Sequence, residues 1–109
     1  TITATVDGDD TATAGIFVRH AETNVSITNS GTITATVDGD HSQTYGIFVD
    51  DINNSSLTNS GTITATVDGN DNQTYGILVH TIDNGSAVIN SGTITATVDG
   101  DDTATAGIF

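Results

Sequence analysis

The acidic side chains of this chain gather in one short turn that recurs along the sequence. An Asp-Gly dipeptide follows each TITATV segment, and three positions around it carry most of the 14 acidic residues. The first position holds Asp7, Asp38, Asp68 and Asp99, the second Asp9, Asp40, Asn70 and Asp101, and the third Asp10, His41, Asp71 and Asp102. Carboxylates and carbonyl oxygens are ligands that Ca²⁺ accepts in loose geometry.

Two interpretations of this acidic turn stay open. In the first, the turn binds Ca²⁺ through these residues: Asp7, Asp9, Asp38, Asp40, Asp68, Asp99 and Asp101. In the second, it is a solvated acidic edge that keeps neighbouring molecules apart. The GGxGxDxUx nonapeptide of calcium-binding β-rolls is absent, which weakens the first interpretation.

Catalytic chemistry has little support in the composition. The formal charge is −13, with one basic residue, Arg19, and no Cys. Nothing can neutralise nucleic-acid phosphates, no thiolate metal site can form, and no apolar run is long enough to span a membrane. The three histidines lie at separate places in the sequence and indicate no shared metal, although Arg19 could pair with Asp50 of the next repeat. Because the acidic turns recur almost unchanged, we expect no enzyme.

These residues recur because the whole chain is repetitive. TITATVDG begins at residues 1, 32, 62 and 93, and residues 1–17 are identical to residues 93–109. We divide the chain into coils 1–31, 32–61 and 62–92 and a partial coil 93–109, so the full period is 92 residues. The pattern predicts a single β-solenoid segment, a piece of a longer tandem array.

Each repeat predicts three short strands separated by turns. TITATV alternates polar and apolar residues, which is typical of a strand with one buried face. GIFV at 15–18 and NVSIT at 24–28 predict two more strands. We expect the following side chains to face inward: Ile2, Ala4, Val6, Ile16, Val18, Val25 and Ile27. The fold class that follows is all-β, a parallel β-helix with 30–31 residues per coil, and the crossover rule favours a right-handed one. A β-sandwich is the alternative.

Stacked coils would turn recurring residues into columns. Asn29, Asn59 and Asn90 precede the Ser-Gly turn and predict a ladder of inward side chains that hydrogen-bond between coils. Phe17, Phe48, Leu78 and Phe109 predict an outward apolar stripe and a lateral interface, unless they form the core and expose Tyr45 and Tyr75 instead. The Thr residues of TITATV predict a flat grid on an outer face.

The GIxV segment and the junction from Ile27 to Ile33 (ITNSGTI) resemble repeats of β-helical bacterial surface proteins, namely autotransporter passengers and filamentous-haemagglutinin-like adhesins. The resemblance implies secretion, display at the cell surface and a structural role. The sequence therefore predicts a non-catalytic extracellular filament or adhesin stalk that self-associates end to end or laterally. Two alternatives remain, an adhesive module that contacts a host surface or glycan, and ice binding through the Thr grid.

Overall fold

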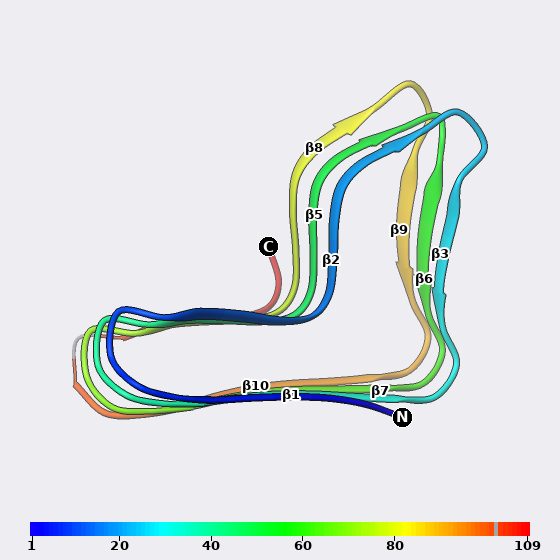
Figure 1. The fold of residues 1–109 in the computed structure, drawn as a ribbon. Helices are drawn as coiled ribbons and strands as arrows, with labels where there is room; N and C mark the ends of the chain where they lie inside the picture. The colour runs from blue at the N-terminus through cyan, green and yellow to red at the C-terminus, as the bar shows by residue number, and fades with distance from the viewer. Residues whose placement is uncertain (102) are drawn as a thin grey trace.

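The chain winds into a β-solenoid built from three parallel sheets (Figure 1). The computed structural model describes residues 1–101 and 103–109, and this part of the chain is all-β, without a helix. The first sheet contains β1 (Ile2–Asp7), β4 (Thr32–Asp38), β7 (Thr62–Asp68) and β10 (Thr93–Asp99). The second contains β2 (Ala12–Glu22), β5 (Gln43–Asn53), β8 (Gln73–Asp83) and β11 (Ala104–Ile108), and the third β3 (Ser26–Asn29), β6 (Ser56–Asn59) and β9 (Ala87–Asn90). The predicted parallel β-helix is confirmed.

Equivalent residues of successive coils lie directly over one another. Ile33 of β4 pairs with Ile2 on one side and Ile63 on the other, and the same register continues to β10. In a parallel sheet, in-register pairing keeps every inward residue above an inward residue. The recurring motifs of the sequence are therefore continuous columns along the axis.

The second strand of each coil is longer than the sequence predicts, and it bends. β5 spans 11 residues rather than the four of GIFV, and Figure 1 shows this sheet turning upward after a first straight part and then slanting again before its arrowheads. Inward residues alternate at Ile47 and Val49, and then Asp50 and Asp51 both face outward before Ile52 is buried again. Two successive outward residues mark a corner, so one hydrogen-bonded strand covers two sides of the coil.

The third strand begins later than residue 24. β3 starts at Ser26 because Thr23 and Asn24 adopt left-handed backbone angles, with φ of 57° and 63°. Asn54 and Asn84 repeat this conformation, which Asn tolerates better than most residues. The predicted inward position of Val25 is occupied in the next coil by Ser55, which is buried.

The core is a single apolar cluster that runs through the inside of the coils. Its side chains come from all three sheets and include Ala21, Ile33, Ile47, Val49, Ile52, Leu57, Ile63, Ile77 and Val79. Gly46 leaves no room for a side chain, because a Cβ there would clash with Ile63 Cγ2 and lie 2.6 Å from the Gly76 carbonyl oxygen. The Gly of GIFV therefore permits close approach of the two sheets.

Candidate functional site

The Asn column lies inside the coils and forms a ladder of side-chain hydrogen bonds. Asn29 Nδ2 donates to Asn59 Oδ1 at 2.7 Å, and Asn59 Nδ2 donates to Asn90 Oδ1 at 2.8 Å. Asn29 Oδ1 also accepts the backbone N–H of Gly31 at 3.1 Å. Asn59 is fully buried in the middle coil, so its amide has protein partners in place of water.

The second acidic column binds backbone as well as facing solvent. Asp9 Oδ1 accepts the N–H of Asp40 at 2.9 Å, and Asp40 Oδ1 accepts the N–H of Asn70 at 2.7 Å. Asn70 Oδ1 continues the series to the N–H of Asp101 at 3.0 Å. Each side chain therefore satisfies a donor of the next coil, a structural use of these residues that the sequence analysis did not consider.

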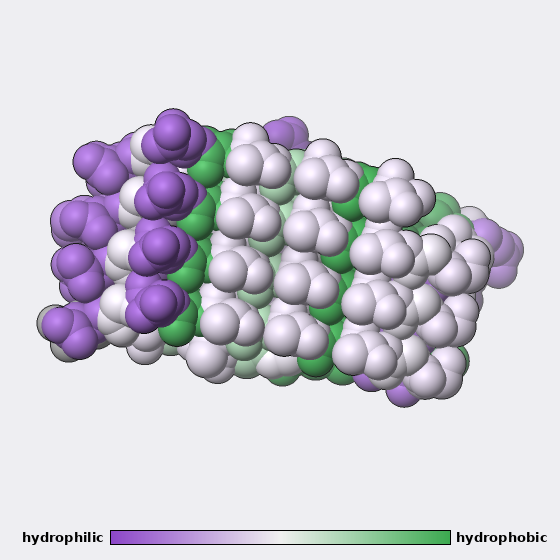
Figure 2. Space-filling model, turned by 90° about the horizontal axis from the view of Figure 1, so that it is seen from below, coloured by the Kyte–Doolittle hydropathy of each residue, from purple (hydrophilic) through white to green (hydrophobic). Residues whose placement is uncertain are grey.

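The other two acidic columns lie at the end of the first strand and in the turn that follows it. Asp7, Asp38, Asp68 and Asp99 are exposed, and Figure 2 shows this acidic edge beside the first sheet. Asp10, His41 and Asp71 take left-handed backbone angles near 55°, whereas Asp102 lies outside the described residues. Among the residues described, the acidic turn brings no three His, Asp or Glu side chains together with their ligand atoms within 4.8 Å of one another. Calcium binding there stays a prediction.

The Phe column lies on the outward face of the second sheet, where Phe48 is two residues before the corner at Asp50. Phe17 and Phe48 stack with ring centroids 5.0 Å apart and an interplanar angle of 2°. Their neighbours Ile47 and Val49 are fully buried, so the column faces away from the core. The column is most exposed in the end coils, at 62% for Phe17 and 70% for Phe109, whereas Leu78, with a strand on either side, is 5% exposed.

Tyr45 and Tyr75 form a second column beside this stripe. Their rings stack with centroids 5.9 Å apart, and the Tyr45 hydroxyl donates to Gln43 Oε1 at 2.7 Å. Burial raises the pKa of Tyr45 above its ordinary value, and the neighbouring Tyr75 adds to the effect. We name the Phe and Tyr columns together the aromatic corner: Phe17, Phe48, Leu78, Phe109, Tyr45 and Tyr75.

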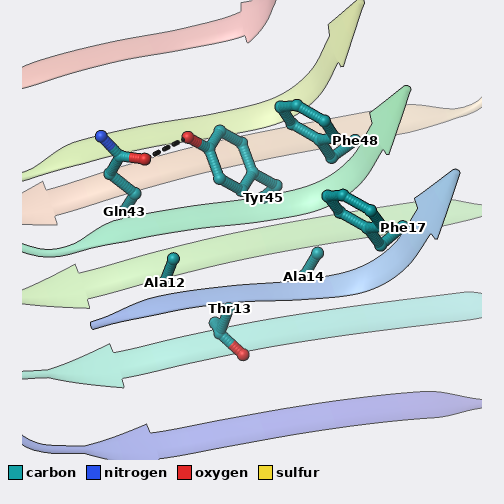
Figure 3. A pocket seen from close by; sticks show the side chains of 7 residues that line it. All are labelled: Ala12, Thr13, Ala14, Phe17, Gln43, Tyr45 and Phe48. Carbon is teal, nitrogen blue, oxygen red and sulfur yellow. Dashed lines mark hydrogen bonds between the residues drawn. The ribbon is translucent and has the colours of Figure 1, made fainter. Parts of the chain in front are cut away.

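A hollow of about 420 Å³ opens in the aromatic corner at the first coil (Figure 3). Ala12 and Ala14 lie in register with Gln43 and Tyr45, so small side chains stand under large ones. The hollow is lined by Ala12, Thr13, Ala14, Phe17, Gln43, Tyr45 and Phe48. Sequence comparison of the repeats shows the Ala-for-Tyr change, and the in-register stacking of β2 on β5 places this small residue beside the large one at the hollow.

The Thr residues of the first sheet make a flat, regular surface. Figure 2 shows their columns side by side over the sheet, next to the acidic edge. Thr34 pairs in register with Thr3 and Thr64, and the other Thr columns do the same. The face therefore presents hydroxyl and methyl groups at the spacing of the sheet, roughly 4.8 Å along the axis.

The histidines pair with aspartates of adjacent coils. His80 Nδ1 lies 2.9 Å from Asp50 Oδ1, His41 Nε2 lies 3.3 Å from Asp71 Oδ2, and His20 Nδ1 lies 4.0 Å from Asp51 Oδ2. Within residues 1–101 and 103–109, these are the ion pairs whose nitrogen and oxygen atoms lie within 4.0 Å of each other, and none of them involves Arg19. The predicted Arg19–Asp50 contact is thus replaced by the His80–Asp50 pair.

Polar residues also line the interior near the acidic turn, which the sequence analysis missed. Asn72 is buried, accepts the N–H of Ser42 at 2.6 Å and donates to the Gly39 carbonyl at 3.0 Å. Thr44 and Thr74 are buried beside it. The signal was available, because the residue immediately before each QTYG segment is small and polar, as Ser42 and Asn72 are.

Comparisons with known proteins return no match. No family model, no curated protein and no solved structure is significantly similar to this chain. Within the described residues, no helix has the length and hydrophobicity needed to cross a bilayer.

Proposed function

We propose that this chain is a structural segment of an extracellular filament or adhesin stalk at a bacterial surface, and that it works by axial continuation of its coils. One observation carries the proposal. The first and last coils begin with the same TITATVD strand, which pairs in register with itself at all three junctions of the first sheet. A further TITATVD strand, from the same chain or another copy, would repeat those pairs.

The end coils support this proposal energetically. β1 and β10 each pair on one side only, and Ile2 is 41% exposed whereas its in-register partner Ile33 is fully buried. Free strand edges and half-covered apolar side chains favour pairing with another strand. The charge of −13 opposes association, and salt screens such repulsion beyond about 10 Å at 0.1 M.

Electron microscopy of the purified chain tests the filament proposal. We expect thin unbranched fibres that become longer as the salt concentration rises. Ile2→Lys places a charge in the end-to-end junction and should shorten the fibres, whereas Thr3→Lys, on the outer Thr face, should leave their length unchanged. Discrete particles at every salt concentration would contradict the proposal, as would equal effects of the two variants.

The aromatic corner supports lateral contact between such filaments. Phe48 has coils on both sides and is still partly exposed beside the hollow under Tyr45, which leaves apolar surface open to a neighbouring filament. Phe48→Ser should reduce the bundling of fibres and leave their individual length unchanged. Bundling that persists in this variant would remove the corner from the interface.

Ice binding through the Thr face is a second candidate function. The flat, in-register Thr array of Figure 2 favours it, since binding to a crystal plane needs a rigid two-dimensional lattice of groups. Thermal hysteresis measured on the chain and on a Thr3→Lys, Thr34→Lys double variant tests it. Hysteresis that the double substitution abolishes would support this function, and absent or unchanged hysteresis would end it.

A further inference from the structure

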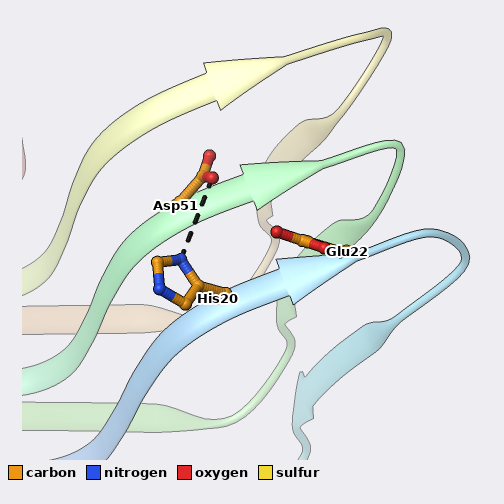
Figure 4. A group of neighbouring side chains, drawn as sticks. All are labelled: His20, Glu22 and Asp51. Carbon is orange, nitrogen blue, oxygen red and sulfur yellow. Dashed lines mark ion pairs between the residues drawn. The ribbon is translucent and has the colours of Figure 1, made fainter.

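Three metal-ligating side chains meet on the outer face of the first two coils (Figure 4). His20 and Glu22 project outward from β2 on either side of the buried Ala21, and Asp51 of β5 lies in register beside His20. One ligand atom from each of the three residues lies within 4.8 Å of the others. Strand pairing, rather than a flexible loop, fixes the positions of the three residues.

Asp51 supplies an independent sign that a ligand belongs here. Its Oδ2 lies 4.0 Å from His20 Nδ1, whereas its Oδ1 is buried and has no hydrogen-bond partner among the described residues. A carboxylate oxygen removed from water without a partner is unfavourable. A cation held by this carboxylate would compensate that cost.

We propose that His20, Glu22 and Asp51 bind one divalent transition-metal ion of the zinc type. The donor set is one imidazole nitrogen and two carboxylates, and imidazole suits Zn²⁺, Cu²⁺ and Ni²⁺ while Ca²⁺ and Mg²⁺ prefer oxygen alone. Three protein ligands leave a further position for water. Because the ligands come from β2 and β5, the ion ties two adjacent coils together.

The chain contains its own controls for this site. The His80–Asp50 and His41–Asp71 pairs also join adjacent coils through an imidazole and a carboxylate. Among the described residues, neither pair has a third metal-ligating side chain within 4.8 Å. If metal binding needs three protein ligands, the His80–Asp50 and His41–Asp71 pairs should not bind the ion, and they can serve as controls.

Calorimetric titration of ZnCl₂ into the complete, chelator-treated chain tests the proposal. We expect one Zn²⁺ per chain, an affinity about tenfold or more lower in both His20→Gln and Glu22→Gln, and an unchanged affinity in His80→Gln. Circular dichroism establishes that each variant keeps its β structure, so weaker binding reports lost ligands rather than lost fold.

Three results would overturn this site: no binding of Zn²⁺, equal weakening in His80→Gln, or full affinity in both His20→Gln and Glu22→Gln. Displacement of Zn²⁺ by roughly a tenfold excess of Ca²⁺ would also contradict the proposed site, because imidazole adds nothing to Ca²⁺ binding. The proposal is independent of filament formation, which is read by microscopy and does not involve these side chains.

Discussion

Asn59 is the member of the Asn ladder whose loss should destabilise the fold most. Asn59→Ala removes the 2.7 Å bond from Asn29 and the 2.8 Å bond to Asn90. Each is worth about 1 kcal/mol net, and a buried polar group left without a partner costs about 1–3 kcal/mol more. Asn29 Nδ2 keeps a 3.3 Å bond to the Thr62 carbonyl, which limits that second cost. We expect a loss of about 2–4 kcal/mol in the free energy of unfolding.

Asn90→Ala is the matched control. Asn90 occupies the same column but is exposed, so water can replace the bond that it makes with Asn59. We expect a loss of about 0.5–1 kcal/mol. Urea unfolding followed by circular dichroism, at low salt and at a concentration where the chain is monomeric, gives both values. Equal losses in the two variants, or less than about 0.5 kcal/mol in Asn59→Ala, would refute an energetic role for burial of the ladder.

Three further predictions follow from close approach, ionisation and the acidic turn. Gly46→Ala should lower the urea midpoint strongly, because its Cβ would lie 2.6 Å from a carbonyl oxygen, whereas Gly31→Ala should be nearly neutral, since nothing lies within 4 Å of its Cβ. The raised pKa of Tyr45 means that the unfolded chain loses this proton first, so the contribution of Tyr45 to stability should be constant below about pH 10 and fall above it. Urea midpoints measured above about pH 10 should therefore fall less steeply in Tyr45→Phe. Asp40→Ala should cost about 0.5–1.5 kcal/mol by removing the acceptor of a backbone N–H. Adding Ca²⁺ to metal-free protein separates the two interpretations of the acidic turn: a bound ion should raise the melting midpoint, whereas a solvated acidic edge should leave it unchanged.

The fold follows closely from the sequence because its signal is repeated. One TITATV segment is an ordinary amphipathic strand, but four copies at nearly equal spacing require in-register stacking. The inward placement of Ile16 and Val18 also follows from alternation, since their stacked partners Ile47 and Val49 are fully buried.

The corners of the coil were harder to predict than its sides. Alternation cannot place the bend at Asp50 and Asp51, because two successive outward residues look like the end of a strand. The left-handed residues Thr23 and Asn24 likewise move the start of β3 to Ser26. Both features depend on how one sheet meets the next, which a single repeat does not encode locally.

The candidate metal site could not be predicted from the sequence for the same reason. His20 and Glu22 are two residues apart, but Asp51 joins them only through the register between β2 and β5. The expected Arg19–Asp50 pair followed from the correct register between coils, but Asp50 pairs instead with His80 of the coil on its other side. Register predicts which residues are neighbours, and side-chain geometry decides which of them interact.

Vertical registry between coils is the central claim, and a pair of spin labels tests it most directly. The chain has no Cys, so Thr34→Cys with Thr64→Cys places two nitroxide labels on in-register positions of the outer Thr face. We expect strong dipolar broadening of the electron paramagnetic resonance spectrum, because these strands lie roughly 4.8 Å apart. With the chain kept monomeric by low salt and low concentration, labels at Thr3 and Thr95, three coils apart at roughly 14 Å, should broaden it far less. Sharp lines from the Thr34 and Thr64 pair, or equal broadening from both pairs, would contradict the stacked solenoid.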